Sequence, residues 1–292
     1  MPNIIAIGEL VVEIMADIKD QPLDKKGLWH GPYPSGAPAI MAAQAACSGS
    51  PSVIIGTVGN DDFGRNITQR LNSLNIKGVR VDDSYTTGVA FVRYNSDGSR
   101  DFIYHIPNAA AGQIYKNQVQ EEYFKDGGFL HITGSSLSVA AVRDAVELAL
   151  SYCKKYDVKV SFDPNMRKEL TAGGERQQLI QKILKQTYIL LPSEGELEFL
   201  TGKSDEGVSI QKLLQDGVEV IALKKGSQGA ELITKNKYFK VKASQVTEVD
   251  PTGAGDIFAG MMLSSLMQNI PYEEALKYAS AAGAYSVTKQ GP

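Results

Sequence analysis

The feature that most constrains the fold of this chain is the alternation of short apolar runs with amphipathic helical segments. Runs of this length between polar segments are typical of buried strands, and they cover Asn3–Gly8, Val53–Val58, Phe129–Thr133, Val158–Phe162, Tyr188–Leu191 and Val218–Leu223. Helical faces between them carry Phe63, Ile67, Leu71 and Leu74 in one case, and Leu137, Val142, Ala145, Leu148 and Ala149 in another. The alternation predicts an α/β fold, a three-layer, mostly parallel sheet with helices on both faces. Ligands of such sheets bind beyond the carboxyl ends of the strands.

One segment departs from this alternation and has the pattern of a β-hairpin. Thr87–Tyr94 and Asp101–Ile106 alternate polar and apolar residues on either side of the turn Ser96-Asp97-Gly98-Ser99. We therefore predict a small β lid formed by residues of about 11–33 and 87–108. The sequence has neither an internal repeat nor a Pro/Gly-rich linker, so we expect a single domain over residues 1–292.

The composition of the chain indicates which binding partners and which cellular compartment to expect. The net charge is −3 and the chain has no basic tract, so neither nucleic acid nor an anionic membrane surface is an expected partner. Two cysteines are typical of a reducing compartment. The first residues, MPNIIAIGEL, lack the basic region of an export signal, and no run of 18 apolar residues occurs. We expect a cytoplasmic protein.

The segment Asp250-Pro251-Thr252-Gly253-Ala254-Gly255-Asp256 is the strongest chemical signal. A predicted strand, Val246–Val249, leads into it, and a helical pattern follows. Gly253, Ala254 and Gly255 would let backbone N–H groups approach a ligand closely at a helix start, which favours anions such as a phosphoryl group. Asp256, in the first helical turn, could accept the proton of an attacking hydroxyl. The alternative is a plain glycine-rich turn with an acidic helix cap.

This segment resembles the C-terminal signature of the ribokinase-like (PfkB) family, and the resemblance extends along nearly the whole chain. The other matching segments are Gly8-Glu9 with Glu13, Ser35-Gly36-Ala37, the glycine pattern Gly56, Gly59, Asp61 and Gly64, Asp163-Pro164-Asn165-Met166-Arg167, Ser193-Glu194-Gly195-Glu196, and Lys225-Gly226-Ser227-Gln228-Gly229. The segment around Asp163 resembles the fructokinase and 2-keto-3-deoxygluconate kinase branches.

The resemblance implies ATP as a cosubstrate with Mg²⁺, a possible K⁺ site, and a set of site residues. It places the sugar against Glu13, Ser35, Gly36, Ala37, Tyr104 and Arg167, and the nucleotide against Ser193, Lys225, Gly226 and Gly229. It also implies that Glu196 orders water around Mg²⁺, and that the carbonyls of Asp250 and Thr252 bind the monovalent cation. Ser193-x-x-Glu196 can also be explained as a helix capping box.

Three departures from the family pattern bear on these expectations. Ser35 replaces a glycine, and Ile40 stands where the family has a sugar-contacting asparagine. Relatives continue with another helix beyond Gly291-Pro292, so we expect part of the adenine pocket to be missing or atypical.

The expected function is ATP-dependent phosphorylation of a hydroxyl on a small sugar. The resemblance to the 2-keto-3-deoxygluconate kinases implies a second arginine directly after the lid tyrosine. In this sequence Tyr104 is followed by His105, so we expect no second fixed positive charge beside Arg167. That favours an uncharged ketohexose over the sugar acid 2-keto-3-deoxygluconate. Two further alternatives are a nucleoside kinase, whose base pocket could use Tyr33, Phe91 or Tyr104, and a non-catalytic sugar- or nucleotide-binding protein, which would be expected to lack Asp256. Exposed edges of the lid predict a homodimer.

Overall fold

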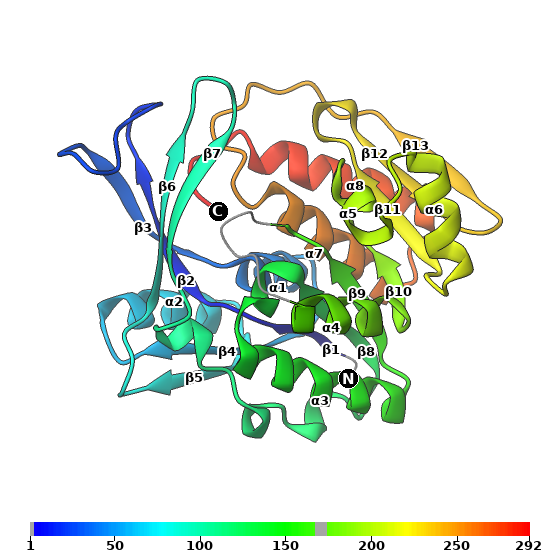
Figure 1. Cartoon of the computed structure of the whole chain (residues 1–292), viewed down its shortest axis with the longest axis horizontal. Coiled ribbons are helices and arrows are strands. Elements are labelled where there is room, and N and C mark those ends of the chain that lie inside the picture. Colours follow the sequence, from blue (N-terminus) through cyan, green and yellow to red (C-terminus); the bar gives the residue numbers. More distant parts are fainter. Residues whose placement is uncertain (1–2, 167–173) are drawn as a thin grey trace.

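The computed structural model describes residues 3–166 and 174–292 and confirms the predicted three-layer α/β architecture (Figure 1). Nine strands of the described residues form one sheet in the order β13-β12-β11-β10-β9-β8-β1-β4-β5. Only β12 runs antiparallel to its two neighbours among these strands. The bounds are β1 Asn3–Ile7, β4 Ser52–Gly59, β5 Lys77–Asp82, β8 Gly128–Thr133, β9 Lys159–Asp163, β10 Thr187–Leu190, β11 Val220–Lys224, β12 Ala230–Ile233 and β13 Tyr238–Val241.

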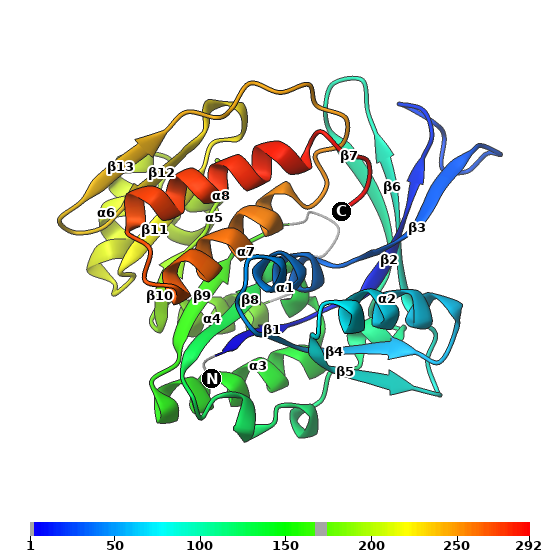
Figure 2. The same cartoon turned by 180° about the vertical axis from the view of Figure 1, so that it is seen from behind.

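Helices cover both faces of this sheet because successive strand side chains point to opposite sides. Ile5 and Ile7 of β1 lie in one apolar core, and Ile4 and Ala6 lie in the other. The first core includes residues of α3 (Ala140–Tyr156), α4 (Gly174–Leu184), α5 (Glu196–Thr201) and α6 (Glu206–Gln215). The second includes residues of α1 (Ala37–Cys47), α2 (Asp62–Ser73), α7 (Ala254–Met267) and α8 (Tyr272–Ser286), which Figure 2 shows from their own side.

Most predicted strands and helices occur within a residue or two of their expected bounds. Leu137 is an exception, because it lies in a short 3-10 segment, Gly134–Ser138, that precedes α3. No helix in residues 3–166 or 174–292 combines the length and apolar character that a membrane span requires.

A second, four-stranded sheet forms the predicted lid beside the main sheet (Figure 1). Its order is β3-β2-β6-β7, with β2 Val11–Ala16, β3 Trp29–Ser35, β6 Gly88–Tyr94 and β7 Arg100–His105. The β6–β7 hairpin is antiparallel, as its alternating pattern predicts, and β2 pairs with β6 in parallel. The lid is therefore assembled from two segments that are far apart in sequence.

The glycine-rich segment after β4 fixes the point at which the chain enters β6. Asp61 caps α2 by accepting from the Gly64 amide at 2.8 Å, and it also accepts from the Thr87 amide at 2.8 Å and hydroxyl at 2.7 Å. The Thr87 hydroxyl in turn accepts from the Gly59 amide at 2.9 Å. Although burial opposes ionisation, these hydrogen bonds hold the pKa of Asp61 below its usual value. One carboxylate thus joins the main sheet, α2 and the lid.

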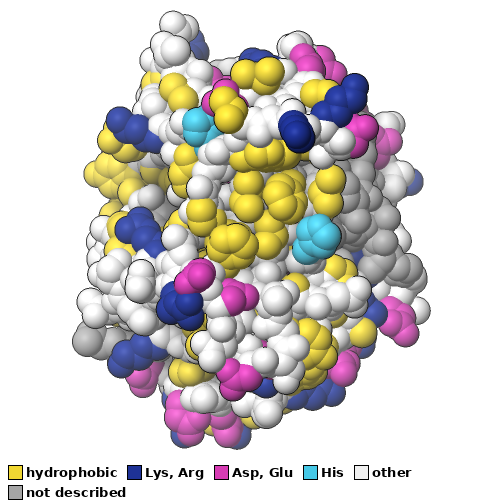
Figure 3. Space-filling model, turned by 90° about the vertical axis from the view of Figure 1, so that its left-hand side faces the viewer, with side chains coloured by type: hydrophobic (Ala, Val, Ile, Leu, Met, Phe, Trp, Pro, Cys, Tyr) yellow, Lys and Arg dark blue, Asp and Glu magenta, His cyan; other side chains and the backbone are white. Residues whose placement is uncertain are grey.

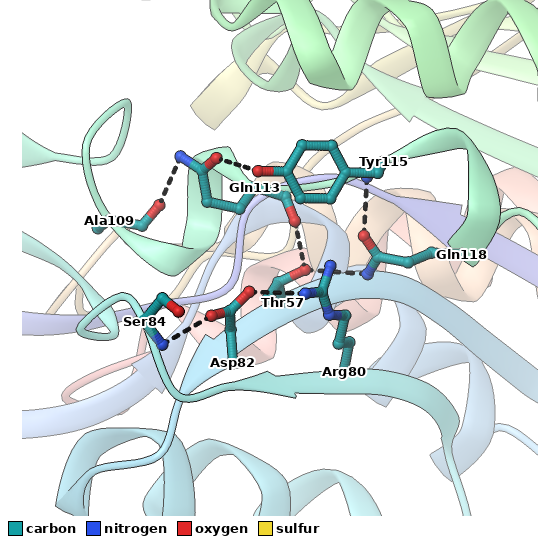
Figure 4. A network of polar contacts seen from close by, with 8 residues as sticks. All are labelled: Thr57, Arg80, Asp82, Ser84, Ala109, Gln113, Tyr115 and Gln118. Carbon is teal, nitrogen blue, oxygen red and sulfur yellow. Dashed lines mark hydrogen bonds and ion pairs between the residues drawn. The ribbon is translucent and has the colours of Figure 1, made fainter.

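A polar network holds the chain where it returns from β7 to the main sheet (Figure 4). Thr57 Oγ1 on β4 donates to the Gln113 carbonyl at 2.8 Å and accepts from Gln118 Nε2 at 2.9 Å. On β5, Arg80 pairs with the buried Asp82 at 2.8 Å and lies over the ring of Tyr115 at 5.5 Å. Both ends of the lid hairpin are therefore anchored on β4 and its neighbours.

The prediction of a strand at Val246–Val249 is wrong. This segment has no regular secondary structure, and Val246 and Val249 are 44% and 60% exposed. The amides of Val249 and Asp250 donate to the Val287 carbonyl at the end of α8 instead of to a strand. The apolar pattern of this segment resembles that of a strand. Its backbone hydrogen-bond partner, however, is the end of α8 rather than a neighbouring strand.

Candidate active site

A pocket lies between the lid, the first turn of α7 and the carboxyl ends of β1 and β9. It is lined by residues of both sheets and of the loops that follow them: Glu9, Val11, Glu13, Gly36, Ala37, Ile40, Arg100, Phe102, Tyr104, Ile106, Ser135, Asn165, Thr252, Gly253 and Asp256. Its position agrees with the general location of ligand sites in parallel sheets.

Asp256 and the glycine-rich helix start lie at the base of this pocket. Gly253 is the N-cap of α7 and has a φ of 74°, a left-handed conformation that favours glycine. Its own packing is close, because a Cβ at this position would lie 3.2 Å from Ile40 Cδ1. Asp256 is 8% exposed in the first turn of α7. Ile40 thus packs against the predicted anion-binding turn rather than offering a polar contact.

Most predicted sugar-binding residues meet at this pocket. Glu13, Gly36, Ala37 and Tyr104 line it. Ser35 is fully buried next to Gly36 and lines a separate small cavity with Ile40. Arg167 lies outside the residues that the structure describes.

The pocket is also lined by two lid residues, Arg100 and Phe102, which the sequence analysis did not select. They share a strand face with Tyr104, because side chains at positions i, i+2 and i+4 of a strand point the same way. The Phe102 and Tyr104 rings stack with centroids 5.1 Å apart, and the Arg100 guanidinium lies 5.9 Å from the Phe102 ring centroid. The expectation of no second fixed positive charge near the substrate is therefore wrong. Counting back from Tyr104 in steps of two residues along the predicted strand could have identified Arg100.

The other aromatic candidates for a nucleoside base pocket lie elsewhere. Phe91 packs edge-on against Trp29 at 5.6 Å and His105 at 6.3 Å, on the lid face opposite Tyr104. Tyr33 lies close to Gly291, where a Cβ would come within 2.7 Å of its ring. Of the three candidates, Tyr104 alone lines the pocket among the described residues.

Glu9 is a buried carboxylate at the floor of the pocket. It accepts hydrogen bonds from the hydroxyl groups of Ser135, at 2.8 Å, and Ser136. Glu9, Glu13 and Asp256 together give the pocket a lining rich in hydrogen-bond acceptors.

The ends of β9 and β11 bring a buried ion pair to the edge of the site. Lys224 Nζ donates to Asp163 Oδ2 at 2.5 Å, and their side chains are 12% and 2% exposed. Although burial disfavours the ammonium, the carboxylates of Asp163, Glu196 and Asp256 outweigh burial and raise the pKa of Lys224. A Cβ on Gly255 would lie 3.4 Å from Lys224 Nζ. Lys224 therefore adjoins the helix start, although the sequence analysis selected Lys225.

The predicted nucleotide turn follows β11 directly. Gly226 and Gly229 have φ values of 51° and 103°, and the Lys225 amide donates to the Gly229 carbonyl at 2.9 Å. Lys225 Nζ forms ion pairs with Glu206 at 2.8 Å and Glu231 at 3.2 Å. The backbone of this turn stays a candidate for phosphate contacts, and the Lys225 side chain is engaged by two carboxylates.

Glu196 stabilises the loop before α5 through both carboxylate oxygens. Oε2 accepts from the Ser193 amide and Oε1 accepts from the Met166 amide, each at 2.7 Å. The bond from the Ser193 amide to the Glu196 carboxylate is the one that the predicted capping box requires, but the N-cap of α5 is Gly195, which has no side-chain cap. The Glu196 amide also donates to the Ser193 carbonyl at 3.1 Å. Burial and the nearby Asp163 raise the pKa of Glu196, and Lys224 opposes that shift.

The predicted cation segment is tied to the lid. The Tyr94 hydroxyl, at the end of β6, donates to the Asp250 carboxylate and is hydrogen-bonded to Thr252 Oγ1. Asp250 also accepts from the amides of Thr252 at 2.9 Å and Gly291 at 2.8 Å. The Asp250 side chain is thus committed within the protein, which leaves backbone carbonyls as the donors for a cation.

A lidded α/β fold with a carboxylate in the first turn of a glycine-capped helix fits a small-molecule phosphotransferase. The model of the pfkB family of carbohydrate kinases matches residues 1–292. The chain belongs to this family and is therefore a carbohydrate kinase, which transfers a phosphoryl group to a sugar hydroxyl.

Individual relatives agree with this assignment. Fructokinase-1 of Oryza sativa subsp. japonica is 31% identical over 99% of this chain and 92% of its own length. A crystal structure of an E. coli protein assigned as a ribokinase II, in complex with ATP and Mg²⁺, has a TM-score of 0.95 and 42% identity over 100% of this chain and 94% of its own. A fructokinase double mutant of Vibrio cholerae O395, with bound fructose, ADP and potassium, has a TM-score of 0.87 and 27% identity over 100% of this chain and 94% of its own.

Proposed function

We propose that this kinase transfers the γ-phosphoryl group of ATP to a primary hydroxyl of an uncharged ketohexose. The observation that carries the proposal is the placing of Asp256 and the α7 helix start in one pocket with Glu9 and Glu13. Carboxylates accept hydrogen bonds from sugar hydroxyls and repel a substrate carboxylate. The relatives named fructokinase, one of them holding fructose and ADP, support the same substrate class.

The reaction follows from the residues at the base of the pocket. Asp256 accepts the proton of the sugar hydroxyl as its oxygen attacks the γ-phosphorus. The amides of Gly253, Ala254 and Gly255 are placed to stabilise the charge on the transferred group. The closed lid excludes water, which would otherwise compete as the acceptor.

The donor set fits a Mg²⁺ ion bound mainly through nucleotide phosphates and water. No group of three or more His, Cys, Asp or Glu side chains within residues 3–166 and 174–292 could hold a metal. Mg²⁺ commonly keeps several waters and uses one or two carboxylates, and Glu196 with Asp163 would supply them. The bound ion would neutralise phosphate charge. The E. coli relative with ATP and Mg²⁺ supports the use of Mg²⁺, and the fructokinase with potassium supports a K⁺ site. For this K⁺ site we propose the carbonyls of Asp250 and Thr252.

The test is a panel assay of ADP release with ATP, Mg²⁺ and a set of ketoses, aldoses, sugar acids and nucleosides. We expect the highest kcat/KM with a ketohexose. Asp256→Asn should lower kcat by about 100- to 10,000-fold, since that is the usual effect of losing a general base, and ATP binding should persist. Turnover of the Asn variant within a few-fold of the wild type would contradict the role of Asp256.

The position of Arg100 favours one second candidate, a 2-keto sugar acid. A guanidinium in the pocket can bind a carboxylate through two parallel hydrogen bonds. The test measures kcat/KM for fructose and for 2-keto-3-deoxygluconate, both in the wild type and in Arg100→Ala. We expect fructose to be preferred by both proteins, because Glu9, Glu13 and Asp256 outnumber the arginine. A preference for the acid that disappears in Arg100→Ala would assign the second substrate instead.

We also propose that the protein is a homodimer joined through its lids and located in the cytoplasm. The face of the molecule that carries the lid has hydrophobic side chains gathered at its centre and charged groups around them (Figure 3). A surface of this kind is typical of protein interfaces. The two cysteines support the reducing compartment.

A further inference from the structure

Lys224 is a cation that the reaction described above does not use. It is the last residue of β11, and its ammonium is buried against the carboxylate of Asp163, the last residue of β9. The two strands flank β10 in the parallel part of the sheet, so their carboxyl ends open on the same edge. This is the edge at which ligands of parallel sheets bind.

The ammonium lies between Asp163 and the anion-binding turn. Lys224 Nζ is 2.5 Å from Asp163 Oδ2, and it is 3.4 Å from the position that a Cβ on Gly255 would occupy. Gly255 is in the first turn of α7, where amide groups lack helical acceptors. An alanine at 255 would stand against the ammonium, whereas the glycine leaves the space between Lys224 and the helix start open to a ligand.

A net gain in stability is a weak explanation for the pair. A buried lysine and aspartate can often be replaced by apolar residues without loss of stability, because desolvation offsets their attraction. An ammonium has three donors, and Asp163 accepts one of them. A phosphoryl group at the α7 helix start would lie within reach of the remaining donors.

We propose that Lys224 is a catalytic residue whose ammonium, oriented by Asp163, binds the phosphoryl group while it is transferred. The inference rests on the proposed function. In the step, the sugar oxygen forms a bond to the γ-phosphorus and its proton passes to Asp256. The bond from that phosphorus to the oxygen bridging the β-phosphate breaks, and its electron pair leaves with ADP. Lys224 stays protonated and offsets negative charge on the non-bridging oxygens.

An ion-paired lysine outside the pocket lining makes a matched comparison. Lys224→Met and Lys224→Gln remove the charge, and the Gln amide can still donate to Asp163. Lys182→Met removes the charge of a lysine on α4 that pairs with Glu147 at 2.6 Å. We expect kcat on the ketohexose to fall by roughly 100- to 1,000-fold in both Lys224 variants, the usual effect of deleting one donor to a developing oxyanion. Lys182→Met should stay within about three-fold of the wild type by the same reasoning.

Ligand binding separates a catalytic from a structural role. We expect the Lys224 variants to bind Mg·ADP within a few-fold of the wild type. Their affinity for ADP–aluminium fluoride in the presence of sugar, a mimic of the transferred phosphoryl group, should fall at least ten-fold, because differential binding of the transition state defines catalysis. A folded Lys224 variant with near-normal kcat overturns the inference. So does an equal loss of affinity for ADP and for the mimic together with a lowered Tm in both variants. Absence of sugar-dependent ADP release from the wild type as well would overturn the proposed function and this inference with it.

Discussion

Glu196 has a structural role in the loop before α5, and we propose that the same side chain also serves the Mg²⁺ site. Its two oxygens accept from the amides of Ser193 and Met166, and its carboxylate lies beside the Asp163–Lys224 pair. Burial, followed by the charge of Asp163, raises its pKa above the ordinary value, so the folded state holds the Glu196 proton more tightly than the unfolded chain does. This contribution to stability is therefore present at low pH and is lost as the pH rises through the folded-state pKa. Above that pKa the ionised Glu196 costs stability.

Glu196→Gln should therefore separate the two roles. The amide carbonyl can still accept one backbone hydrogen bond, and the charge is gone, so we expect Tm at pH 7 to stay the same or rise. The Mg²⁺ concentration for half-maximal activity should rise, because one carboxylate near the nucleotide phosphates is lost. Activity titrations with Mg²⁺ and thermal melts at pH 5 and pH 7 measure both effects.

Glu196→Ala is the comparison variant, since it also removes the cap, which costs around 1 kcal/mol. If Glu196→Gln keeps the wild-type Mg²⁺ dependence, the residue is a cap and nothing more.

The two lysines at the end of β11 mark the limit of what the sequence could predict about the site. The glycine turn after them indicated a nucleotide contact, but residues 224 and 225 are both lysines and point to different partners. Lys224 pairs with Asp163, whereas Lys225 pairs with Glu206 and Glu231. Which lysine faces the site depends on the register of β11 in the sheet, and that is set by long-range pairing rather than by local sequence.

At the scale of elements, the lid is attached to the rest of the molecule at both ends of β6. Asp61 and Thr87 hold the root of β6, and Tyr94 holds its far end against Asp250 and Thr252. Burial and the hydrogen bond to Asp250 raise the pKa of Tyr94, so its hydroxyl stays a proton donor at neutral pH. The contact joins lid closure to the segment that precedes the helix start of α7.

Tyr94→Phe should weaken closure of the lid without changing the chemical step. A hydrogen bond to a charged group contributes about 1.5–3 kcal/mol, so we expect kcat/KM for the sugar to fall roughly ten- to a hundred-fold, mainly through KM. Steady-state kinetics with varied sugar measure the change.

Tyr278→Phe on α8, where the tyrosine is 48% exposed, is the matched control and should leave both constants unchanged. An unaltered KM in Tyr94→Phe, or a fall in kcat alone, would show that the contact does not govern closure.

The elements differ in how far their sequences determine them. The β6–β7 hairpin was predictable because alternation and a turn rich in Asp and Gly are local signals. The segment Val246–Val249 has a similar apolar content but pairs with the end of α8, and that partner comes from a distant part of the chain. Likewise, Arg100 was missed although its strand was predicted, because the side of the strand that faces the pocket becomes clear only when β6 and β7 pair with β2.

At the scale of the whole molecule, the lid has two faces with different chemistry. Glu13, Ala90 and Tyr104 form a row across β2, β6 and β7 on the pocket side. The next row, on the opposite side, is Ile14, Phe91 and Ile103, and Ile103 is 43% exposed. The rings of Trp29 and His105 pack edge-on against Phe91 on this side. Figure 3 shows hydrophobic side chains gathered at the centre of the face that carries the lid. A partner that covers the outer face would hold the lid sheet rigid and leave the pocket face free.

A second copy of the chain is the partner we expect there, and Ile103→Glu tests it. A glutamate at the centre of an apolar interface must be desolvated without a matching cation, so we expect the dimer dissociation constant to rise at least ~100-fold. Sedimentation at micromolar concentration should then change from about twice the chain mass of 31.6 kDa to the single mass. Val208→Glu, at a 48% exposed position on α6, is the control and should stay dimeric. Both substitutions are at exposed positions, so Tm should move by little more than the change due to dissociation. A wild type that sediments as a monomer, or an Ile103→Glu variant that stays dimeric, would place the interface elsewhere or remove it.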